Sequence, residues 1–146
     1  MSGVLNGMHR VFLDSAPVIY FVEGHPVYCS ILEPVFSRFE AGDLVPVTSP
    51  ITLAECLVLP MKQGRVDVIE AFLELMGGDH SSVFVPIQRD TARMAADIRS
   101  RHNLTLTDAF QVASALQGNC DALLTNDKNL STITDLKVVL VEELSL

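Results

Sequence analysis

Four acidic residues of this 146-residue chain lie where apolar runs typical of strands give way to stretches of helical periodicity. Asp14 ends the first run, and Asp127 directly follows the fourth. Glu55 lies just after the second run, and Asp108 lies in the first turn of the helical stretch before the fourth. Clustered carboxylates repel one another unless a cation neutralises them, and such hard oxygen ligands suit Mg²⁺ or Mn²⁺. If the fold brings the four acids together, they predict a site for one or two divalent ions.

The elements that must position these acids are short strands alternating with longer helices. Continuous apolar runs predict strands at Val11–Asp14, Val45–Ser49, Val83–Ile87, Ala122–Thr125 and Val138–Val141, and prolines weaken the second and third. Apolar residues at helical spacing predict helices over Pro26–Ala41, Arg65–Met76, Arg89–Arg101 and Thr105–Gln117. This alternation favours an α/β fold, a parallel sheet with helices on both faces. Right-handed crossovers then place the carboxyl ends of all strands along one edge, where such sheets bind ligands.

Each acid also has a purely structural explanation as part of a helix cap. Asp14 is suited to cap the first helix. Glu55 would complete a capping box with Thr52, but the pair Ser49–Pro50 is a better helix start and would place Glu55 in the helix interior.

The two later acids have similar alternatives. Asp108 would complete a capping box with Thr105, and Asp127 would cap a short helix at Lys128–Ser131. Capping explains any one acid. It does not require that all four converge on one point, which the parallel sheet predicts.

Composition limits the classes of function. With 18 acidic and 10 basic residues the formal net charge is −8, which argues against non-specific nucleic-acid binding through clustered cations. A hydrophobic fraction of 49% excludes intrinsic disorder. The three cysteines, Cys29, Cys56 and Cys120, are widely spaced, which indicates reduced thiols instead of disulfides or a zinc site.

The chain is expected to be a single cytoplasmic domain over residues 1–146, with a core from about 11 to 142. The apolar stretch Val11–Val22 is interrupted by Asp14 and Pro17 and is too short to cross a membrane. No membrane association is therefore expected.

The densest cationic stretch comprises Arg89, Arg93, Arg99, Arg101 and His102. Such a run is usually a solvated helix surface. The alternative is a flank that contacts phosphates and leads toward Asp108.

Four segments together resemble the PIN domain family, and in particular the VapC-type toxin ribonucleases of toxin–antitoxin pairs. They are Val11–Ser15 (VFLDS), Thr52–Glu55 (TLAE), Leu106–Ala115 (LTDAFQVASA) and Leu124–Leu130 (LTNDKNL). The resemblance implies a three-layer fold with a five-stranded parallel sheet of order 3-2-1-4-5. It also implies metal-dependent hydrolysis of RNA, leaving 5′-phosphate and 3′-hydroxyl ends.

Carried over to this chain, the family's catalytic and metal-binding acids fall on Asp14, Glu55, Asp108 and Asp127. Its polar substrate-binding neighbours fall on Ser15, Thr125 and Asn126. The expected cofactor is Mg²⁺ or Mn²⁺, as one or two ions. The expected partners are the RNA substrate, an antitoxin protein and a second copy of the chain.

Two other functions compete with this interpretation. A haloacid-dehalogenase-like phosphatase needs a second acid two residues after its nucleophile, but Ala16 stands there after Asp14. A non-catalytic PIN-like binding or dimerisation module usually lacks one or more acids, and here all four are present.

Overall fold

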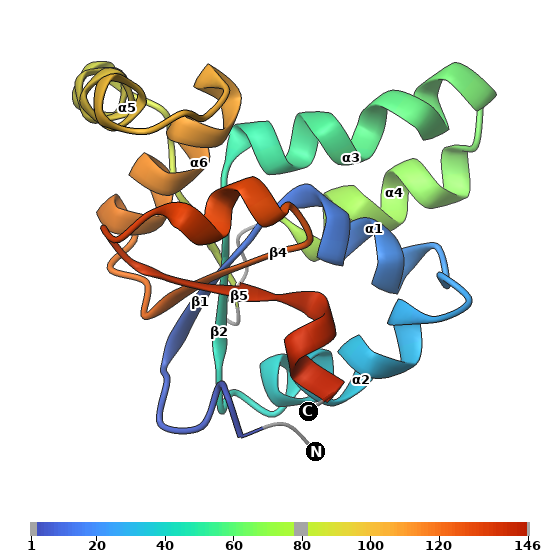
Figure 1. Cartoon of the computed structure of the whole chain (residues 1–146). Helices are drawn as coiled ribbons and strands as arrows, with labels where there is room; N and C mark the ends of the chain where they lie inside the picture. Colours follow the sequence, from blue (N-terminus) through green and yellow to red (C-terminus); the bar gives the residue numbers. More distant parts are fainter. Residues whose placement is uncertain (1–2, 78–81, 146) are drawn as a thin grey trace.

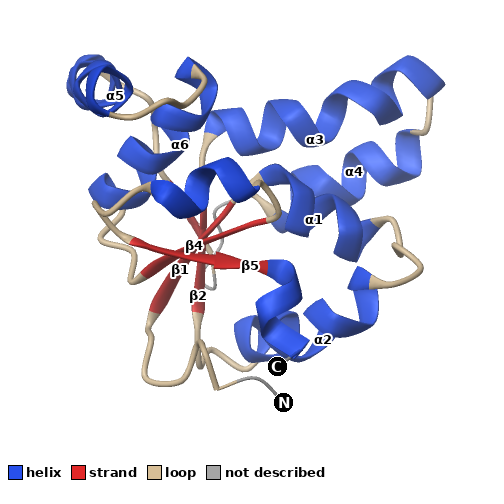
Figure 2. Cartoon of the chain, viewed as in Figure 1, coloured by secondary structure: helices blue, strands red, loops and turns tan. Residues whose placement is uncertain are grey.

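The computed structural model describes residues 3–77 and 82–145, and within these ranges five strands form one parallel sheet of order β3-β2-β1-β4-β5 (Figure 2). The strands are β1 (Arg10–Leu13), β2 (Val45–Thr48), β3 (Val83–Phe84), β4 (Ala122–Thr125) and β5 (Lys137–Leu140). The predicted α/β fold and strand order are confirmed. Because β1 and β4 are neighbours, Leu13 lies opposite Leu124, and the residues that follow these strands meet at one edge.

Helices cover both faces of the sheet (Figure 1). The helices are α1 (Ser15–Val22), α2 (Tyr28–Glu40), α3 (Pro50–Gln63), α4 (Val66–Leu75), α5 (Arg89–Arg101) and α6 (Leu106–Gln117), with 3₁₀ turns η1 (Lys128–Thr132) and η2 (Val141–Ser145). Helices α1 to α4 pack with Val11 and Leu13 in one apolar core, whereas α5 and α6 pack with Phe12 in the other. Successive side chains of β1 thus enter opposite cores, as strands covered on both faces require.

Pro46 is tolerated inside the sheet because its nitrogen, which carries no hydrogen, faces a side where no ladder hydrogen bond forms at that position. The amide of Val45 donates to the carbonyl of His9 on the β1 side (2.8 Å), so the nitrogen of the next residue faces the β3 side. Pairing with β3 begins only opposite Val47, so Pro46 removes no ladder hydrogen bond. The third strand is shorter than predicted: regular pairing ends at Phe84, and one further bond joins the Val85 amide to the Thr48 carbonyl (2.8 Å).

Helix α3 begins at the Ser49–Pro50 pair, as the stronger of the two sequence alternatives predicts. The Ser49 hydroxyl accepts hydrogen bonds from the amides of Ile51 (3.2 Å) and Thr52 (3.3 Å). At the other end Gly64 adopts a left-handed conformation (φ 65°), which ends the helix without a side-chain clash. Glu55 therefore lies in the second turn of α3 and is no part of its cap.

Of the other predicted helices, Arg89–Arg101 matches α5 in both bounds, and those that correspond to α2, α4 and α6 differ only at their ends, by one or two residues. The turn η2 was not predicted, because its five residues are too few to establish a helical period. Among the described helices, none is long and apolar enough to cross a membrane.

Candidate active site

The carboxyl edge of the sheet carries an open hollow of about 280 Å³ beside β1 and β4. It is lined by Asp14, Ser15, Ala16, Tyr20, Glu55, Asp108, Asn126 and Asp127. The structure thus brings all four predicted acids to one place, from the starts of α1 and α6, from α3 and from the end of β4. Parallel pairing of β1 with β4 accounts for the approach of Asp14 to Asp127, which are 113 positions apart in sequence.

Asp14 is the most rigidly held of the four acids. It is 7% exposed and is the N-cap of α1, where its Oδ1 accepts a hydrogen bond from the Ser15 amide (2.9 Å). Its Oδ2 accepts a hydrogen bond from the Thr125 hydroxyl (2.8 Å). The cap and the hollow therefore use the same carboxylate.

Gln111 is a buried positioning residue that the sequence analysis did not identify. Its side chain is 0% exposed, and its Nε2 donates to Asp14 Oδ1 (3.4 Å) and to Thr52 Oγ1 (2.9 Å). Its Oε1 accepts a hydrogen bond from the Ser49 hydroxyl (2.6 Å). The signal was its spacing: Gln111 lies three residues after Asp108, so both side chains share one face of α6.

Asp108 is half-buried in the first turn of α6, where its surroundings disfavour the charged form of its carboxyl. Burial is the main cause that raises its pKa to about 6, followed by a hydrogen bond with Asp127 and the charges of Asp14 and Asp127. The Thr105 hydroxyl caps α6 by accepting from the Asp108 amide (3.1 Å), and it partly offsets the rise. A proton shared between Asp108 and Asp127 relieves the repulsion, and a cation between them would do the same.

Glu55 extends from α3 at the more exposed side of the hollow. Burial raises the pKa of this carboxyl, the negative charge of Asp14 raises it further, and a hydrogen bond with Ser15 lowers it. The negative charge of Asp14 therefore disfavours ionisation of Glu55, although Asp14 caps α1 and Glu55 belongs to α3.

The three predicted substrate-binding residues divide into two groups. Ser15 and Asn126 line the hollow, and Asn126 Nδ2 donates to the Tyr20 hydroxyl (2.9 Å). Thr125 is 0% exposed: its hydroxyl donates to Asp14 and accepts from the Asp127 amide (3.0 Å). Thr125 therefore lies beneath the hollow and holds two of the acids, and its contact with a substrate stays a prediction.

The donor set of the hollow has the chemistry of a hard-cation site. All four charged groups are carboxylates. The pKa values of Asp108 and Glu55 are raised, which means that their surroundings do not neutralise the negative charge of these two side chains. Nevertheless, over residues 3–77 and 82–145, no three acidic, histidine or cysteine side chains form a ready-made ligand cluster. The residues fit Mg²⁺ or Mn²⁺ by donor type.

Two of the three cysteines are unsuitable as nucleophiles. Burial is the largest cause that raises the pKa of Cys56 and of Cys120 to about 12, so neither thiol is a nucleophile at neutral pH. Ala16 lines the hollow where a dehalogenase-like phosphatase requires an acid.

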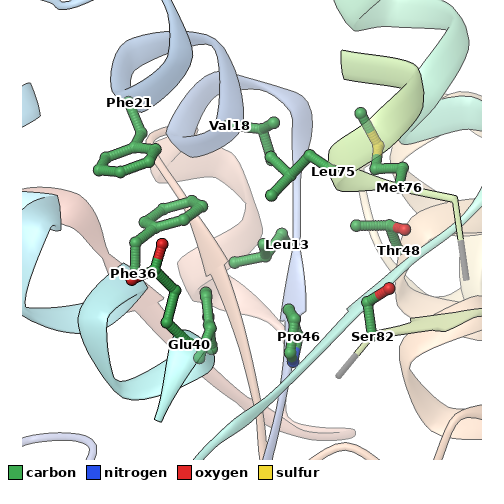
Figure 3. Close-up of a pocket in the computed structure, with 11 residues that line it drawn as sticks. Leu13, Val18, Phe21, Phe36, Glu40, Pro46, Thr48, Leu75, Met76 and Ser82 are labelled. Atoms are coloured by element: carbon green, nitrogen blue, oxygen red, sulfur yellow. The ribbon is translucent and has the colours of Figure 1, made fainter. Parts of the chain in front are cut away.

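A separate pocket of about 110 Å³ lies between α1, α2 and the sheet (Figure 3). Its walls are mainly apolar side chains such as Leu13, Val18 and Phe36, and Glu40 is the acid among its described lining residues. Its described lining therefore contains no group of acids like that of the acidic hollow.

The fold and the acidic hollow define a class of three-layer α/β proteins with carboxylates at the carboxyl edge of a parallel sheet. The model of the PIN domain matches residues 11–136, and the chain belongs to the PIN domain family. A comparison with curated proteins found no match.

Solved structures share the fold at low sequence identity. VapBC2 from Rickettsia felis, bound to a DNA fragment from its promoter, is 15% identical with a TM-score of 0.67, covering 90% of this chain and 98% of that one. VapC20 from Mycobacterium tuberculosis, a toxin that cleaves the Sarcin-Ricin loop, is 15% identical with a TM-score of 0.67, covering 87% and 98%. A toxin–antitoxin complex from Klebsiella pneumoniae is 22% identical with a TM-score of 0.65, covering 88% and 95%.

Proposed function

We propose that this chain is a metal-dependent endoribonuclease that hydrolyses RNA phosphodiester bonds and acts as the toxin of a toxin–antitoxin pair. The observation that carries the proposal is the gathering of Asp14, Glu55, Asp108 and Asp127 around one hollow. Membership of the PIN family supports it, as does the fold shared with VapC20, a toxin that cleaves the Sarcin-Ricin loop.

The acids would divide the work according to their environments. Asp14, fixed by its hydrogen bonds, and Asp108 would be the principal ligands of Mg²⁺ or Mn²⁺, and Asp127 and Glu55 would complete the set. A bound ion supplies Lewis-acid polarisation and lowers the pKa of water. Glu55 is exposed and its pKa is raised, so its carboxylate is suited to accept a hydrogen bond from the attacking water. Ser15 and Asn126 would contact the substrate.

The proposal includes a cytoplasmic location and two protein partners, an antitoxin and a second copy of the chain. Helices α3 and α4 expose large apolar side chains, namely Val58, Leu59, Met61, Val66 and Leu73, each at least 46% exposed. Such a surface is expected to be covered by another protein. The Klebsiella pneumoniae structure is a toxin–antitoxin complex, which supports this part of the proposal.

Cleavage of a labelled single-stranded RNA by the purified chain tests the activity. We expect cleavage with Mg²⁺ or Mn²⁺, none with EDTA, and none from Asp14→Asn. Equal cleavage by Asp14→Asn would refute the assignment of the acidic hollow. Hydrolysis of a small phosphate ester without RNA cleavage would favour a phosphatase, and absence of both activities and of Mn²⁺ binding would favour a non-catalytic module.

A further inference from the structure

A second hollow of about 320 Å³ adjoins the acidic one on the side of α5 and α6. Asp108 and Asp127 line both hollows, so they form the boundary between the two. Arg99, from the last turn of α5, also lines the second hollow. Of the described residues that line either hollow, Arg99 is the only lysine or arginine.

The arginines of α5 differ in what they contact. Arg93 pairs with Asp90 (3.0 Å), and Arg101 pairs with Asp97 (3.0 Å) and Asp135 (2.9 Å). In contrast, within the part of the chain that the structure describes, the exposed side chains of Arg89 and Arg99 make no ion pair or hydrogen bond, and of these two only Arg99 lines the hollow.

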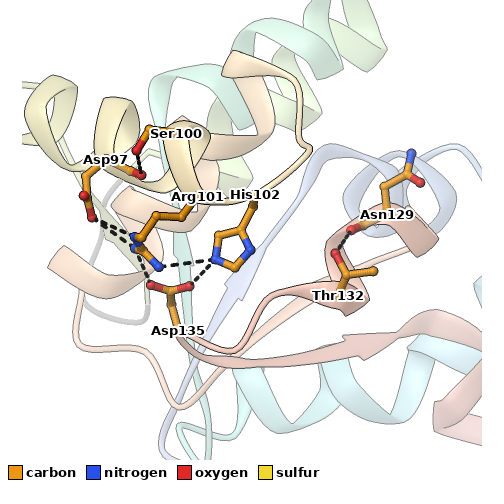
Figure 4. A network of polar contacts seen from close by, with 7 residues as sticks. All are labelled: Asp97, Ser100, Arg101, His102, Asn129, Thr132 and Asp135. Atoms are coloured by element: carbon orange, nitrogen blue, oxygen red, sulfur yellow. Dashed lines mark hydrogen bonds and ion pairs between the residues drawn. The ribbon is translucent and has the colours of Figure 1, made fainter.

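A polar network fixes the end of α5 from which Arg99 projects (Figure 4). Asp135, in the connection from η1 to β5, accepts from Arg101 and also contacts His102 Nε2 (2.9 Å). His102 is the C-cap residue of α5. The backbone beside Arg99 is therefore anchored to the sheet side of the molecule, while the Arg99 side chain stays free to meet a ligand.

The positive charge of Arg99 favours an anion in the second hollow, beside the acids. Arg99 lines the same hollow as Asp108 and Asp127, and among the described residues it forms no ion pair with either carboxylate. A guanidinium without a partner, facing the hollow of a protein with a net charge of −8, is suited to a phosphate, which it binds with paired N–H donors.

We infer that Arg99 forms a second subsite, which binds a phosphate of the RNA strand next to the phosphate held at the four acids. This inference rests on the proposed function and adds a direction: the strand crosses the boundary at Asp108 and Asp127 and continues toward α5. The side chains of Asn103 and Asn129, which also line this hollow, lie beside that path.

Binding of a single-stranded RNA as a function of salt tests the inference in the inactive Asp14→Asn background. Each phosphate contact contributes a slope of about 0.7 to the logarithmic salt dependence on single strands. We expect Arg99→Ala to lower the slope by about 0.7 and to weaken binding at low salt, and Arg99→Lys to keep the slope. Arg89→Ala is the matched control, because Arg89 is an exposed arginine at the other end of the same helix.

Cleavage kinetics provide the second measurement. In the otherwise native chain, Arg99→Ala should raise KM several-fold with little change in kcat, since it removes binding outside the reacting centre. If wild type cleaves RNA and Arg99→Ala behaves like Arg89→Ala in both assays, the Arg99 inference alone is refuted. If wild type neither binds nor cleaves RNA, the proposed function fails and the inference fails with it.

Discussion

Replacing Asp108 by asparagine should stabilise the folded chain while abolishing activity. In the structure, burial and the neighbouring Asp127 and Asp14 raise the pKa of this carboxyl from 3.8 to about 6. The folded protein therefore disfavours the charged form of Asp108. Asparagine removes the charge, and its amide is able to donate a hydrogen bond to Asp127, so we expect the substitution to relieve the repulsion without creating a cavity.

The size and the pH dependence of this effect follow from the shift. Above a pH of about 6, Asp108 is charged in both the folded and the unfolded chain, and the folded state carries the full penalty. Below 3.8 the group is neutral in both states and the penalty is absent. A rise from 3.8 to about 6 corresponds to about 3 kcal/mol, which solvent screening of this half-buried group reduces to about 1–2 kcal/mol.

Urea unfolding of wild type and Asp108→Asn at pH 7.5, 6, 5 and 4, in EDTA, measures this difference. At pH 7.5 the variant should be more stable by about 1–2 kcal/mol, or roughly 2–8 °C in Tm, and the gap should close toward pH 4. Glu70→Gln, on the exposed surface of α4, is the control, and its free energy of unfolding should equal that of wild type at every pH. A variant less stable than wild type at pH 7.5, or a gap independent of pH, would refute the reasoning.

Three further predictions concern the same site. Asp14→Asn should abolish cleavage with little loss of stability, because the amide still caps α1, whereas Asp14→Ala should cost about 2 kcal/mol in urea unfolding since it leaves the Thr125 hydroxyl and one N–H of Gln111 without an acceptor. Gln111→Leu should lower both stability, by about 1–3 kcal/mol, and kcat, and unchanged kcat would show that Gln111 does not position Asp14. Mn²⁺ at ten times its Kd should stabilise wild type by about 1.4 kcal/mol but stabilise Asp108→Asn less at the same concentration, and equal shifts would place the ion elsewhere.

Most of the fold was predictable because apolar runs and helical periods report burial directly. The carboxyl-edge positions of Asp14 and Asp127 follow from the strand order, which needs no knowledge of side-chain contacts. The length of the third strand was not predictable in the same way. Its apolar run continues to Ile87, but pairing depends on how far the partner β2 extends, and β2 ends at Thr48.

The supporting residues of the site were harder to predict because their roles depend on distances across the sheet. Thr125 has the type and location of a substrate-binding residue, and only the structure shows that it is buried and donates a hydrogen bond to Asp14. Gln111 shares a face of α6 with Asp108, but its partners Ser49 and Thr52 come from a segment about 60 positions away. Arg99 was one of several arginines in a run, and only its place in the second hollow together with the ion pairs of Arg93 and Arg101 distinguishes it.

Capping and metal binding, which compete as explanations at the level of sequence, are compatible in the structure. Asp14 caps α1 and lines the hollow, and the Asp127 side chain accepts from the Asn129 amide (2.9 Å) at the start of η1 while lining the same hollow. A cap lies where a strand ends and a helix begins, which in a parallel sheet is also the edge where carboxylates converge. The amides at helix starts stabilise negative charge there, so the caps reduce the repulsion that four gathered acids would otherwise create. Helix capping therefore helps to make the acidic hollow possible.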